Sequence, residues 1–463
     1  MLSALRNGAT RHVRGLATAA SSYPGALLNV PKTVVTKLNN GLLVATESNP
    51  SLSTATVGVW IDSGSRSETK ANNGVAHFLE HISFKGTKSR TQTGLEVEIE
   101  NMGGHLNAYT SREHTVYYAK LLSGDLPKGV AILGDILQHS NLDEGAIERE
   151  RSVILRESAE VDKQIEEVVF DHLHATSFPD SSLGYTILGP EANIKSLKRT
   201  DLQQYIAQNY TADRMVVVGA GNVDHQALCK LAEQHFGSLP TGTGKAKFAK
   251  PAFTGSDVRI RNDDMPTAHI AFAVESAGWT SPDHWPLLVA SAMMGSYDRA
   301  SSAAHPSSKL AQIVRDHKIA NSFTSFNTTY SDTGLWGIYL QSNARDNLDD
   351  LQHFTIREWM GLALSPSEGA VAVAKQQLKT SLLLSLDGTT PTAEEIGRQM
   401  LAYGRRLTPY EIDRLVDAVT VADVKRVAHD YIYDRDLSIV AIGPVEGLPD
   451  YNRVRAAMNL LRY

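Results

Sequence analysis

A faint internal repeat, with two units of roughly 200 residues, constrains the fold of this chain more than any other feature. Residues 55–61 alternate in a way that predicts a half-buried strand, and residues 268–274 repeat the pattern. Near the end of each unit a helical stretch leads into an apolar strand, at residues 201–223 and 423–445. A unit that recurs in this way predicts two similar domains.

Both units combine separated strands with long helical stretches, and residues 107–111 correspond to residues 321–325. We therefore predict an α+β fold with two homologous domains, each a mainly antiparallel β-sheet packed with α-helices. The N-terminal domain is expected over residues 30–236 and the C-terminal domain over residues 258–463. Between them, residues 237–257 are rich in Gly, Pro, Thr and Lys and predict a linker. Chance similarity between short segments is the alternative to a true repeat.

The first residues have the composition of a targeting segment. No acidic residue precedes Glu47, and Arg6, Arg11 and Arg14 lie among Leu, Val, Ala and Ser residues. This composition is typical of a mitochondrial transit peptide. We expect residues 1–15 to be one, with Arg14 two positions before the new N-terminus. A disordered basic tail is the alternative.

Charge, cysteine content and hydropathy exclude several classes of protein. Without residues 1–15, 42 basic residues face 51 acidic ones, a net charge of −9. An acidic protein attracts basic partners and disfavours non-specific binding of nucleic acid. The single cysteine, Cys229, excludes an intramolecular disulfide and a cysteine-based zinc cage. No stretch reaches the roughly 18 apolar residues of a membrane-spanning helix, so no transmembrane segment is expected.

The strongest chemical signal is H-x-x-E-H at residues 77–81, inside a predicted helix over residues 74–84. On a helix, positions i, i+3 and i+4 share one face, so His77, Glu80 and His81 point the same way. Two imidazoles one turn apart can bind one zinc ion at about 2.0–2.1 Å, and the carboxylate between them reaches the water on that ion. The motif has the inverted order of the commoner zinc-peptidase motif.

A catalytic zinc site needs a third protein ligand. A predicted acidic helix over residues 143–162 carries four glutamates: Glu148, Glu150, Glu157 and Glu160. Glu150 and Glu157 are seven residues apart and therefore lie on one face, two turns from each other. One of them can bind the metal while the other supports the site by hydrogen bonds. A solvated charged face is the alternative, because arginines alternate with these glutamates.

Together, H-x-x-E-H and Glu157, which 75 residues separate, resemble the pitrilysin-type (inverzincin) metallopeptidases. Residues 84–87, 103–113 and 150–157 resemble one group of this family in particular. That group contains the β subunits of mitochondrial processing peptidases and the related core 1 subunits of the cytochrome bc1 complex. The resemblance covers nearly all of the chain after its first residues.

The resemblance implies one Zn²⁺ ion per chain, with His77, His81 and Glu157 as its ligands. It further implies that Glu80 is the general base and that Glu150 supports the ligands from outside. The family has a processing-peptidase-like metallohydrolase fold, in which two chains enclose a chamber. The second half lacks H-x-x-E-H, as the inactive repeat of the family does.

The resemblance also implies the substrate, which is a basic N-terminal presequence cut two residues after an arginine. A predicted strand over residues 105–111 can pair with an extended peptide through backbone hydrogen bonds. Its central residues are Asn107, Ala108 and Tyr109. Glu167 and Asp171, four apart on one helical face, match the acids that accept the arginine. Phe84 matches the residue that contacts the apolar side chain after the cut. A surface charge pair and a core aromatic are the alternatives.

Three functions are compatible with this sequence. The first is a zinc metalloendopeptidase, the catalytic β subunit of a heterodimer in the mitochondrial matrix; its α subunit supplies a glycine-rich loop that this chain lacks. The second is core subunit 1 of the bc1 complex, peripheral on the matrix side of the inner membrane, which is either structural or also a processing enzyme. The third is a self-sufficient, peptide-degrading homodimer of the same superfamily.

Overall fold

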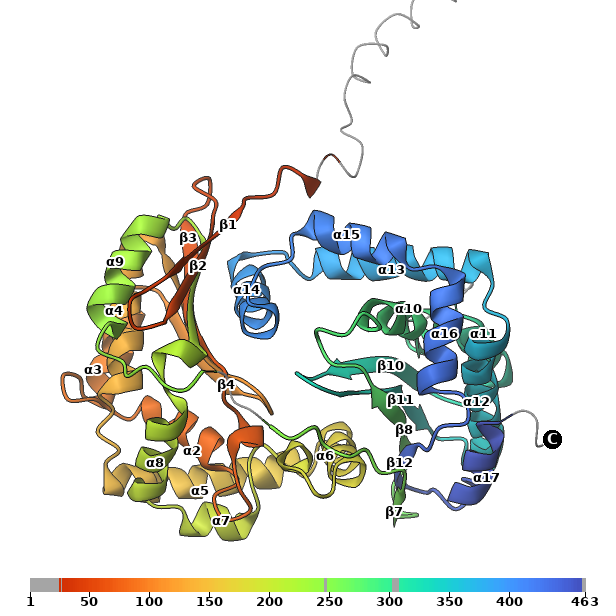
Figure 1. Ribbon diagram of the computed structural model, residues 1–463. Coiled ribbons are helices and arrows are strands. Elements are labelled where there is room, and N and C mark those ends of the chain that lie inside the picture. Colours follow the sequence, from red (N-terminus) through yellow and green to blue (C-terminus); the bar gives the residue numbers. More distant parts are fainter. Residues whose placement is uncertain (1–24, 26, 245–247, 302–307, 460–463) are drawn as a thin grey trace, which may run out of the picture.

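The computed structural model describes residues 25, 27–244, 248–301 and 308–459. Its strands form two six-stranded sheets, one in each half of the chain, which lie side by side (Figure 1). The predicted α+β fold with two similar, mainly antiparallel sheets is confirmed. The predicted targeting segment, residues 1–15, lies outside the described residues.

Among the described residues, the first half contains six strands, eight complete α-helices and several short 3-10 helices. The strands are β1 (Thr33–Lys37), β2 (Leu43–Ser48), β3 (Thr54–Ile61), β4 (His105–Thr110), β5 (Thr115–Leu122) and β6 (Met215–Gly221). The helices are α2 (Val75–Ser83), α3 (Gln92–Asn101), α4 (Leu126–Gln138), α5 (Glu144–Val161), α6 (Ile165–Ser177), α7 (Glu191–Ser196), α8 (Arg199–Asn209) and α9 (His225–Phe236).

The second half has the same numbers of strands and complete α-helices among its described residues. The strands are β7 (Asp257–Arg261), β8 (Ala268–Ser276), β9 (Ser296–Asp298), β10 (Ser322–Thr329), β11 (Gly334–Ser342) and β12 (Ser438–Gly443). The helices are α10 (His284–Met294), α11 (Lys309–His317), α12 (Leu348–Leu364), α13 (Glu368–Leu384), α14 (Thr389–Tyr403), α15 (Pro409–Ala418), α16 (Val421–Tyr431) and α17 (Tyr451–Ala457). The domain boundary at residues 237–257 stays a prediction.

The two sheets share one strand order. The first runs β1-β2-β6-β3-β5-β4 and the second β7-β12-β8-β11-β10-β9, so five strands correspond when the orders are shifted by one. Each sheet has one parallel pair, which is β2 with β6 in the first sheet and β7 with β12 in the second. The other pairs are antiparallel. The sheets differ at their edges. β1 extends the first sheet beside β2, whereas β9 extends the second beside β10, at the opposite edge.

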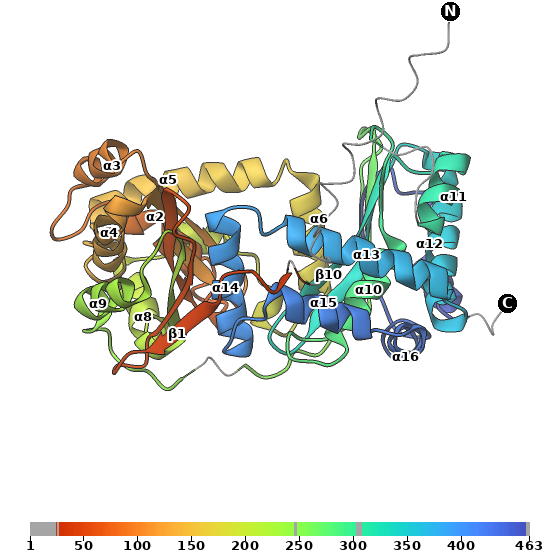
Figure 2. The same ribbon diagram turned by 90° about the horizontal axis from the view of Figure 1, so that it is seen from above.

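Each sheet is covered on one face by helices of its own half and on the other face by one helix of the other half. Helices α4 and α9 cover one face of the first sheet, and α14 from the second half covers the opposite face. In return α6, from the first half, packs on β8 and β12 of the second sheet. Figures 1 and 2 show α14 in blue beside the first sheet and α6 in yellow beside the second.

The side chains of β3 alternate between these two layers. Val57 and Val59 belong to the core beneath the helices of the first half, whereas Trp60 packs against α14. The strand predicted over residues 55–61 is confirmed as part of β3, but the expectation that it is half-buried is wrong, because every residue of this run is buried. The face that we expected to meet water is covered by a helix nearly 330 residues further along the chain.

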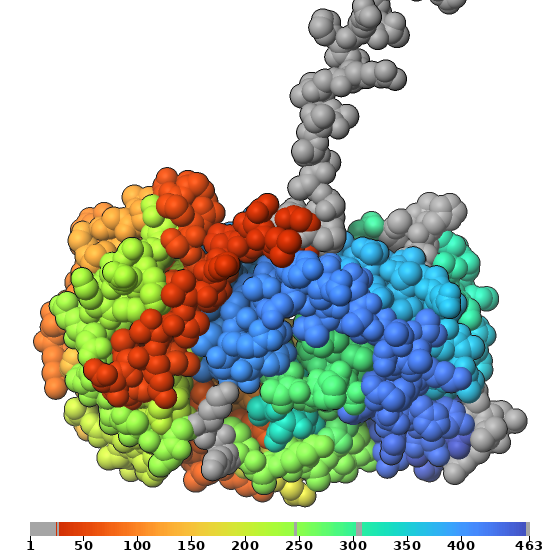
Figure 3. All heavy atoms as spheres, turned by 45° about the horizontal axis from the view of Figure 1, so that its top comes forward, coloured from red at the N-terminus to blue at the C-terminus, as the bar shows by residue number. Residues whose placement is uncertain are grey.

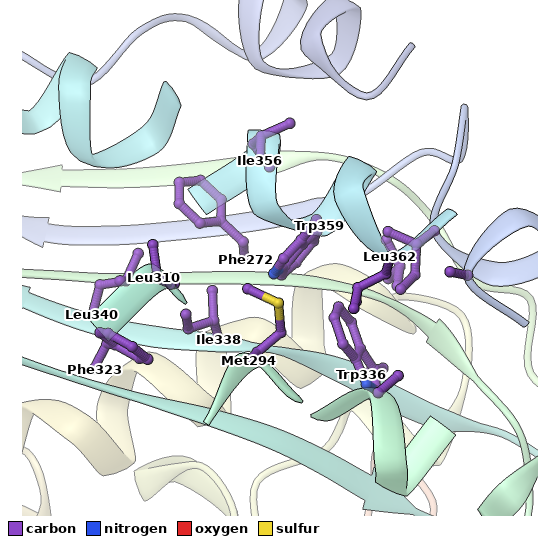
Figure 4. Close-up of a cluster of buried hydrophobic side chains, with 14 of the residues drawn as sticks. Phe272, Met294, Leu310, Phe323, Trp336, Ile338, Leu340, Ile356, Trp359 and Leu362 are labelled. Atoms are coloured by element: carbon purple, nitrogen blue, oxygen red, sulfur yellow. The ribbon is translucent and has the colours of Figure 1, made fainter. Parts of the chain in front are cut away.

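The core between the second sheet and the helices of its own half contains two fully buried tryptophans. Trp336 on β11 and Trp359 on α12 meet edge to face with ring centroids 4.9 Å apart (Figure 4). Such aromatic pairs add about 0.5–1.5 kcal/mol beyond the area that they bury. The indole N–H of Trp336 donates to the Leu287 carbonyl at 3.1 Å, so the polar atom of this ring is satisfied inside the core.

Polar contacts fix α14 to the first sheet. Trp60 Nε1 donates to Glu394 Oε2 at 3.0 Å, and the Tyr109 hydroxyl donates to Glu394 Oε1. The Thr56 and Thr389 hydroxyls are also hydrogen-bonded, at 2.8 Å. On the molecular surface the blue residues of the second half lie directly against the red residues of the first strands (Figure 3). In the described part of the chain no helix combines the length and the apolar character needed to cross a membrane.

Gly397 lets α14 approach the first sheet, because a Cβ at this position would overlap the indole ring of Trp60. We expect Gly397→Ala to lower stability by about 1–3 kcal/mol through overpacking, although alanine is the better helix former. Gly361→Ala in α12 is the matched control. A Cβ at that position meets no atom within 4 Å, so this change is expected to stabilise the protein by up to about 1 kcal/mol. Thermal unfolding followed by circular dichroism measures both effects, and equal midpoints for the two variants would contradict the close packing.

Candidate metal centre

Helix α2 carries the H-x-x-E-H motif and begins directly after Gly74. The backbone of Gly74 has a φ of 99°, and a Cβ there would lie 2.5 Å from the Leu188 carbonyl oxygen, so only glycine fits this start. Phe78, Leu79 and Ile82 face the core of the first half. The helix predicted over residues 74–84 is confirmed as Val75–Ser83.

Helix α5 brings two glutamates to the same place. Its N-terminus is capped by Asp143, which accepts a hydrogen bond from the Ala146 amide at 2.8 Å. Ile147 and Ile154 are buried in the core that α2 shares. Glu150 and Glu157 lie on the same face of α5 as these isoleucines and reach the motif histidines. The acidic helix predicted from the sequence is thus present as Glu144–Val161.

His77, His81 and Glu157 converge. Glu157 Oε2 lies 3.1 Å from His81 Nε2 and 3.8 Å from His77 Nε2, and one ligand atom from each residue falls within 4.8 Å of the others. Ligands at about 2.1 Å from one tetrahedral ion lie about 3.4 Å from each other, so these separations suit a single zinc ion. Within the described ranges, this is the one group of three or more His, Cys, Asp or Glu side chains with such spacing.

The donor atoms themselves fit a metal ion. Glu157 Oε2 is buried and has no hydrogen-bond partner among the described residues, although His81 Nε2 lies 3.1 Å away. A cation held between Glu157 and the two imidazoles would give this oxygen the partner that it lacks. Two imidazole nitrogens and one carboxylate oxygen are also a ligand set that zinc accepts in catalytic sites.

Glu150 orients one of these ligands. The carboxylate is buried, and its Oε1 lies 3.0 Å from His81 Nδ1, while its Oε2 pairs with Lys85 Nζ at 3.0 Å. A proton on Nδ1, donated to Glu150, leaves Nε2 of His81 free to bind a metal. This contact supports the role that the sequence predicts for Glu150. No role was predicted for Lys85, although it lies in the run of residues 84–87 that carries part of the family resemblance.

Local charges set the protonation of the three groups. Burial, reinforced by His81, lowers the pKa of His77 to about 4, so this imidazole is neutral near pH 7, as a metal ligand must be. Burial opposes a charge on His81, but the carboxylates of Glu157 and Glu150 outweigh it and raise the pKa of His81. The nearby His81 imidazole lowers the pKa of Glu157, which therefore carries the negative charge that a cation needs.

Glu80 lies beside this group and outside it. Its Oε2 accepts a hydrogen bond from the Thr110 hydroxyl at 2.7 Å, and burial raises the pKa of its carboxyl. A carboxylate with a raised pKa, held by Thr110, is suited to accept a proton and pass it on. Thr110 was not given a role from the sequence; it is the last residue of β4, directly after Tyr109.

Strand β4 forms an edge of the first sheet next to Glu80. In the part of the chain that the structure describes, β4 pairs with β5 alone. Asn107 is exposed and its Nδ2 donates to the Tyr118 hydroxyl at 3.4 Å, while Ala108 packs on the core of the first half. Tyr109 points to the other face and contacts Glu394 of α14. Within the described residues, the predicted substrate strand therefore has one edge without a partner strand, although the Ala108 amide already donates to Asn107 Oδ1 at 2.9 Å.

Phe84 caps the C-terminal end of α2 and lines a cavity of about 280 Å³. The apolar lining also includes Leu95 and Ile99 of α3 and Leu106 of β4. This cavity lies between the C-terminal end of the motif helix, α3 and β4. An apolar side chain of a bound peptide would find a matching surface there.

The predicted acid pair is arranged differently from our expectation. Asp171 Oδ1 already accepts a hydrogen bond from Arg112 Nη2 at 2.6 Å. Glu167, one turn earlier on α6, is exposed and has no ion-pair partner among the described residues. The spacing of Glu167 and Asp171 predicts their shared face, but an arginine 59 residues away in sequence neutralises one of them.

Comparison with known families agrees with this fold and site. Residues 43–191 match the family model described as insulinase (peptidase family M16), and residues 196–378 match the peptidase M16 inactive domain. The chain belongs to peptidase family M16, a family of metallopeptidases. The family and the enzyme class predicted from the motifs are therefore confirmed.

Individual proteins of known name are also similar to this chain. The chain is 80% identical to the mitochondrial-processing peptidase subunit beta of Blastocladiella emersonii, over all of both chains. It is 52% identical to the subunit of that name from Bos taurus, over 94% of this chain and 89% of the relative. A chain in the solved structure of complex III2 from Candida albicans with Inz-5 bound has a TM-score of 0.82 and 29% identity, covering 93% of this chain and 100% of that chain.

We expect Glu150→Gln to weaken binding of a zinc ion by about 10- to 100-fold, because the amide no longer holds the His81 tautomer. Glu148→Gln is the control; Glu148 lies on the same helix, but it is exposed and pairs with Arg151. Competition with a chromogenic chelator measures the affinity of each variant. A Glu150→Gln affinity equal to that of the control would show that the contact with His81 has no effect on the metal.

Proposed function

We propose that this chain is a zinc endopeptidase, the catalytic β subunit of a heterodimer that removes basic presequences from proteins imported into mitochondria. One observation carries the proposal. Two imidazoles and a carboxylate meet within 4.8 Å, and Glu80 lies beside them, hydrogen-bonded to the Thr110 hydroxyl. This arrangement offers a metal three ligands and offers a water molecule a base.

His77, His81 and Glu157 would hold the zinc ion. When bound, zinc lowers the pKa of a water molecule toward about 7 and polarises the carbonyl of the peptide to be cut. Glu80 takes the proton of the attacking water, and its raised pKa helps it to keep that proton until the leaving amine accepts it. Thr110 holds the carboxylate in place through these steps. Glu150 and Lys85 fix the ring of His81.

The open edge of β4 supports an extended substrate. A peptide that pairs with Asn107, Ala108 and Tyr109 adds a strand to the first sheet, and backbone hydrogen bonds of this kind read no particular side chain. The strand would run past Glu80, because Thr110 at the end of β4 contacts that residue. The apolar side chain that follows the cut would enter the cavity lined by Phe84.

Charge supports a basic substrate. The net charge of −9 for residues 16–463 attracts presequences before specific contacts form. Glu167 presents the free carboxylate of the acid pair, whereas Arg112 neutralises Asp171. An arginine two residues before the cut would therefore meet Glu167 first and then share Asp171 with Arg112.

A partner chain and a mitochondrial location complete the proposal. The relatives at 80% and 52% identity are named as β subunits, which supports an α subunit as the partner. The glycine-rich loop expected of that partner has no counterpart in this sequence. The acid-free start of the chain supports import into the matrix.

Membership of a respiratory complex is the second candidate function. The likeness to a chain of complex III2, with a TM-score of 0.82, favours a core subunit on the matrix side of the inner membrane. Such a subunit is either structural or also an enzyme. Co-purification separates these cases, because haem proteins would accompany a core subunit whereas an α-like chain alone would accompany the processing enzyme.

The deciding experiment mixes the purified chain with its α partner and follows cleavage of a presequence peptide. We expect cleavage with zinc and none after chelation. Glu80→Gln should still bind zinc but lose about 10²- to 10⁴-fold in rate, because the general base is missing. Metal analysis of the same samples shows that the variant is loaded. Normal cleavage by zinc-loaded Glu80→Gln would refute the role of this residue.

Glu167→Gln tests the acid that receives the substrate arginine. We expect KM for an arginine-containing presequence to rise about two- to fivefold, the effect of losing one exposed ion pair. Glu166→Gln removes the same charge from the neighbouring position of α6 and should leave KM unchanged. A peptide with alanine in place of arginine should not distinguish the two variants. Equal KM values for both variants with the arginine peptide would assign the arginine to another site.

A further inference from the structure

A buried carboxylate caps the metal-binding helix from outside that helix. Gly74, at the N-cap position of α2, has no side chain to satisfy the first amides. Glu68 does so instead. Its Oε2 accepts hydrogen bonds from the Gly74 amide at 2.9 Å and from Asn73 Nδ2 at 2.8 Å, and its Oε1 accepts from the Ala76 amide at 2.8 Å.

This cap is next to the proposed ligands. Val75 is the first residue of α2, so His77 lies in the first turn and His81 in the second. The carboxylate also stabilises the positive end of the helix dipole. Burial raises the pKa of Glu68 to about 7, and its three donors offset only part of that desolvation. If the cap is lost, the first turn frays and His77 moves away from Glu157.

Two residues before Glu68, Arg66 ties the same segment to the second half of the chain. Arg66 is 1% exposed, and its Nη1 and Nη2 donate to Asp332 Oδ1 and Oδ2, each at 2.8 Å. Its Nη1 also donates to Glu113 Oε1 at 2.7 Å, and Glu113 in turn accepts from the Ser331 amide. Ser331 and Asp332 belong to the turn between β10 and β11.

The short stretch between these two side chains is itself fixed. A 3-10 turn, Ser65–Ser67, joins them, and the Glu68 amide donates to the Ser65 carbonyl at 3.1 Å. The Arg66 carbonyl accepts from the Ser182 hydroxyl at 2.6 Å. Because these hydrogen bonds fix the backbone between the two residues, a displacement of Arg66 also displaces Glu68.

We propose that Glu68 is a positioning residue for the metal site, and that the second half of the chain holds it in place through Asp332 and Arg66. The half that lacks the metal motif thus contributes to metal binding in the other half. This inference rests on the proposed zinc site.

The experiment compares three full-length variants with the wild-type chain at about pH 8, roughly one unit above the pKa of Glu68. Glu68→Gln places an amide N–H against the helix amides and leaves donors unpaired. Asp332→Asn weakens the tie to the second half and leaves Glu68 intact. Glu446→Gln is the control, because this residue of the second half is exposed and pairs with Arg261.

Zinc affinity is measured by chelator competition, and kcat and KM are measured with the α partner present. We expect Glu68→Gln to weaken zinc binding about tenfold. Asp332→Asn should weaken it about threefold. Both should lower kcat at saturating zinc and leave KM unchanged, because His77 moves while the peptide edge does not. A merely structural loss would reduce the folded fraction without changing the affinity or kcat of what remains.

Affinities and kcat values equal to those of the control in both variants would overturn the proposal. A loss in Glu68→Gln together with a normal Asp332→Asn would overturn the link to the second half. If Glu68→Gln does not fold, Asp332→Asn decides the question. A wild-type chain that neither binds zinc nor cleaves would instead refute the proposed function itself.

Discussion

The structure depends on an exchange of helices between two sheets that are apolar on both faces. The first sheet buries Trp60 against α14, and the second buries Ala271 and Ala273 against α6. In each case the helix that covers these side chains comes from the other half, so separating the halves would expose this apolar layer to water and lose its hydrophobic stabilisation. Buried apolar contacts therefore hold the two halves together, in addition to the covalent connection between them.

The helices exchanged between the two halves contact residues next to the proposed site. Glu394 of α14 binds Tyr109, and the next residue, Thr110, binds Glu80. On the other side, α5 carries Glu157 and leads into α6, which packs on the second sheet. Glu80 is thus linked to the second half through Thr110 and its neighbour Tyr109, and Glu157 lies on the helix that precedes α6. An inactive repeat fixed in this way serves as a support for the metal site.

Helical spacing predicted much of the site, because side chains three, four or seven residues apart must share a face. It placed His77, Glu80 and His81 together, and it placed Glu150 and Glu157 on one side of a second helix. The same logic could not show that Arg112 neutralises Asp171 or that Glu68 caps α2. Arg112 and Asp171 lie 59 residues apart, and Glu68 acts from a loop, so no period connects these partners.

By itself the sequence determined the local elements, the repeat and the chemistry of the candidate ligands, since periodicity and residue type are properties of short stretches. Only the tertiary structure decided which faces are buried, which carboxylates are already paired and which half supports the other. Burial and ion pairing depend on segments that meet in space. The helix that covers residues 55–61 begins at Thr389, and no pattern within the strand itself predicts that this helix packs on it.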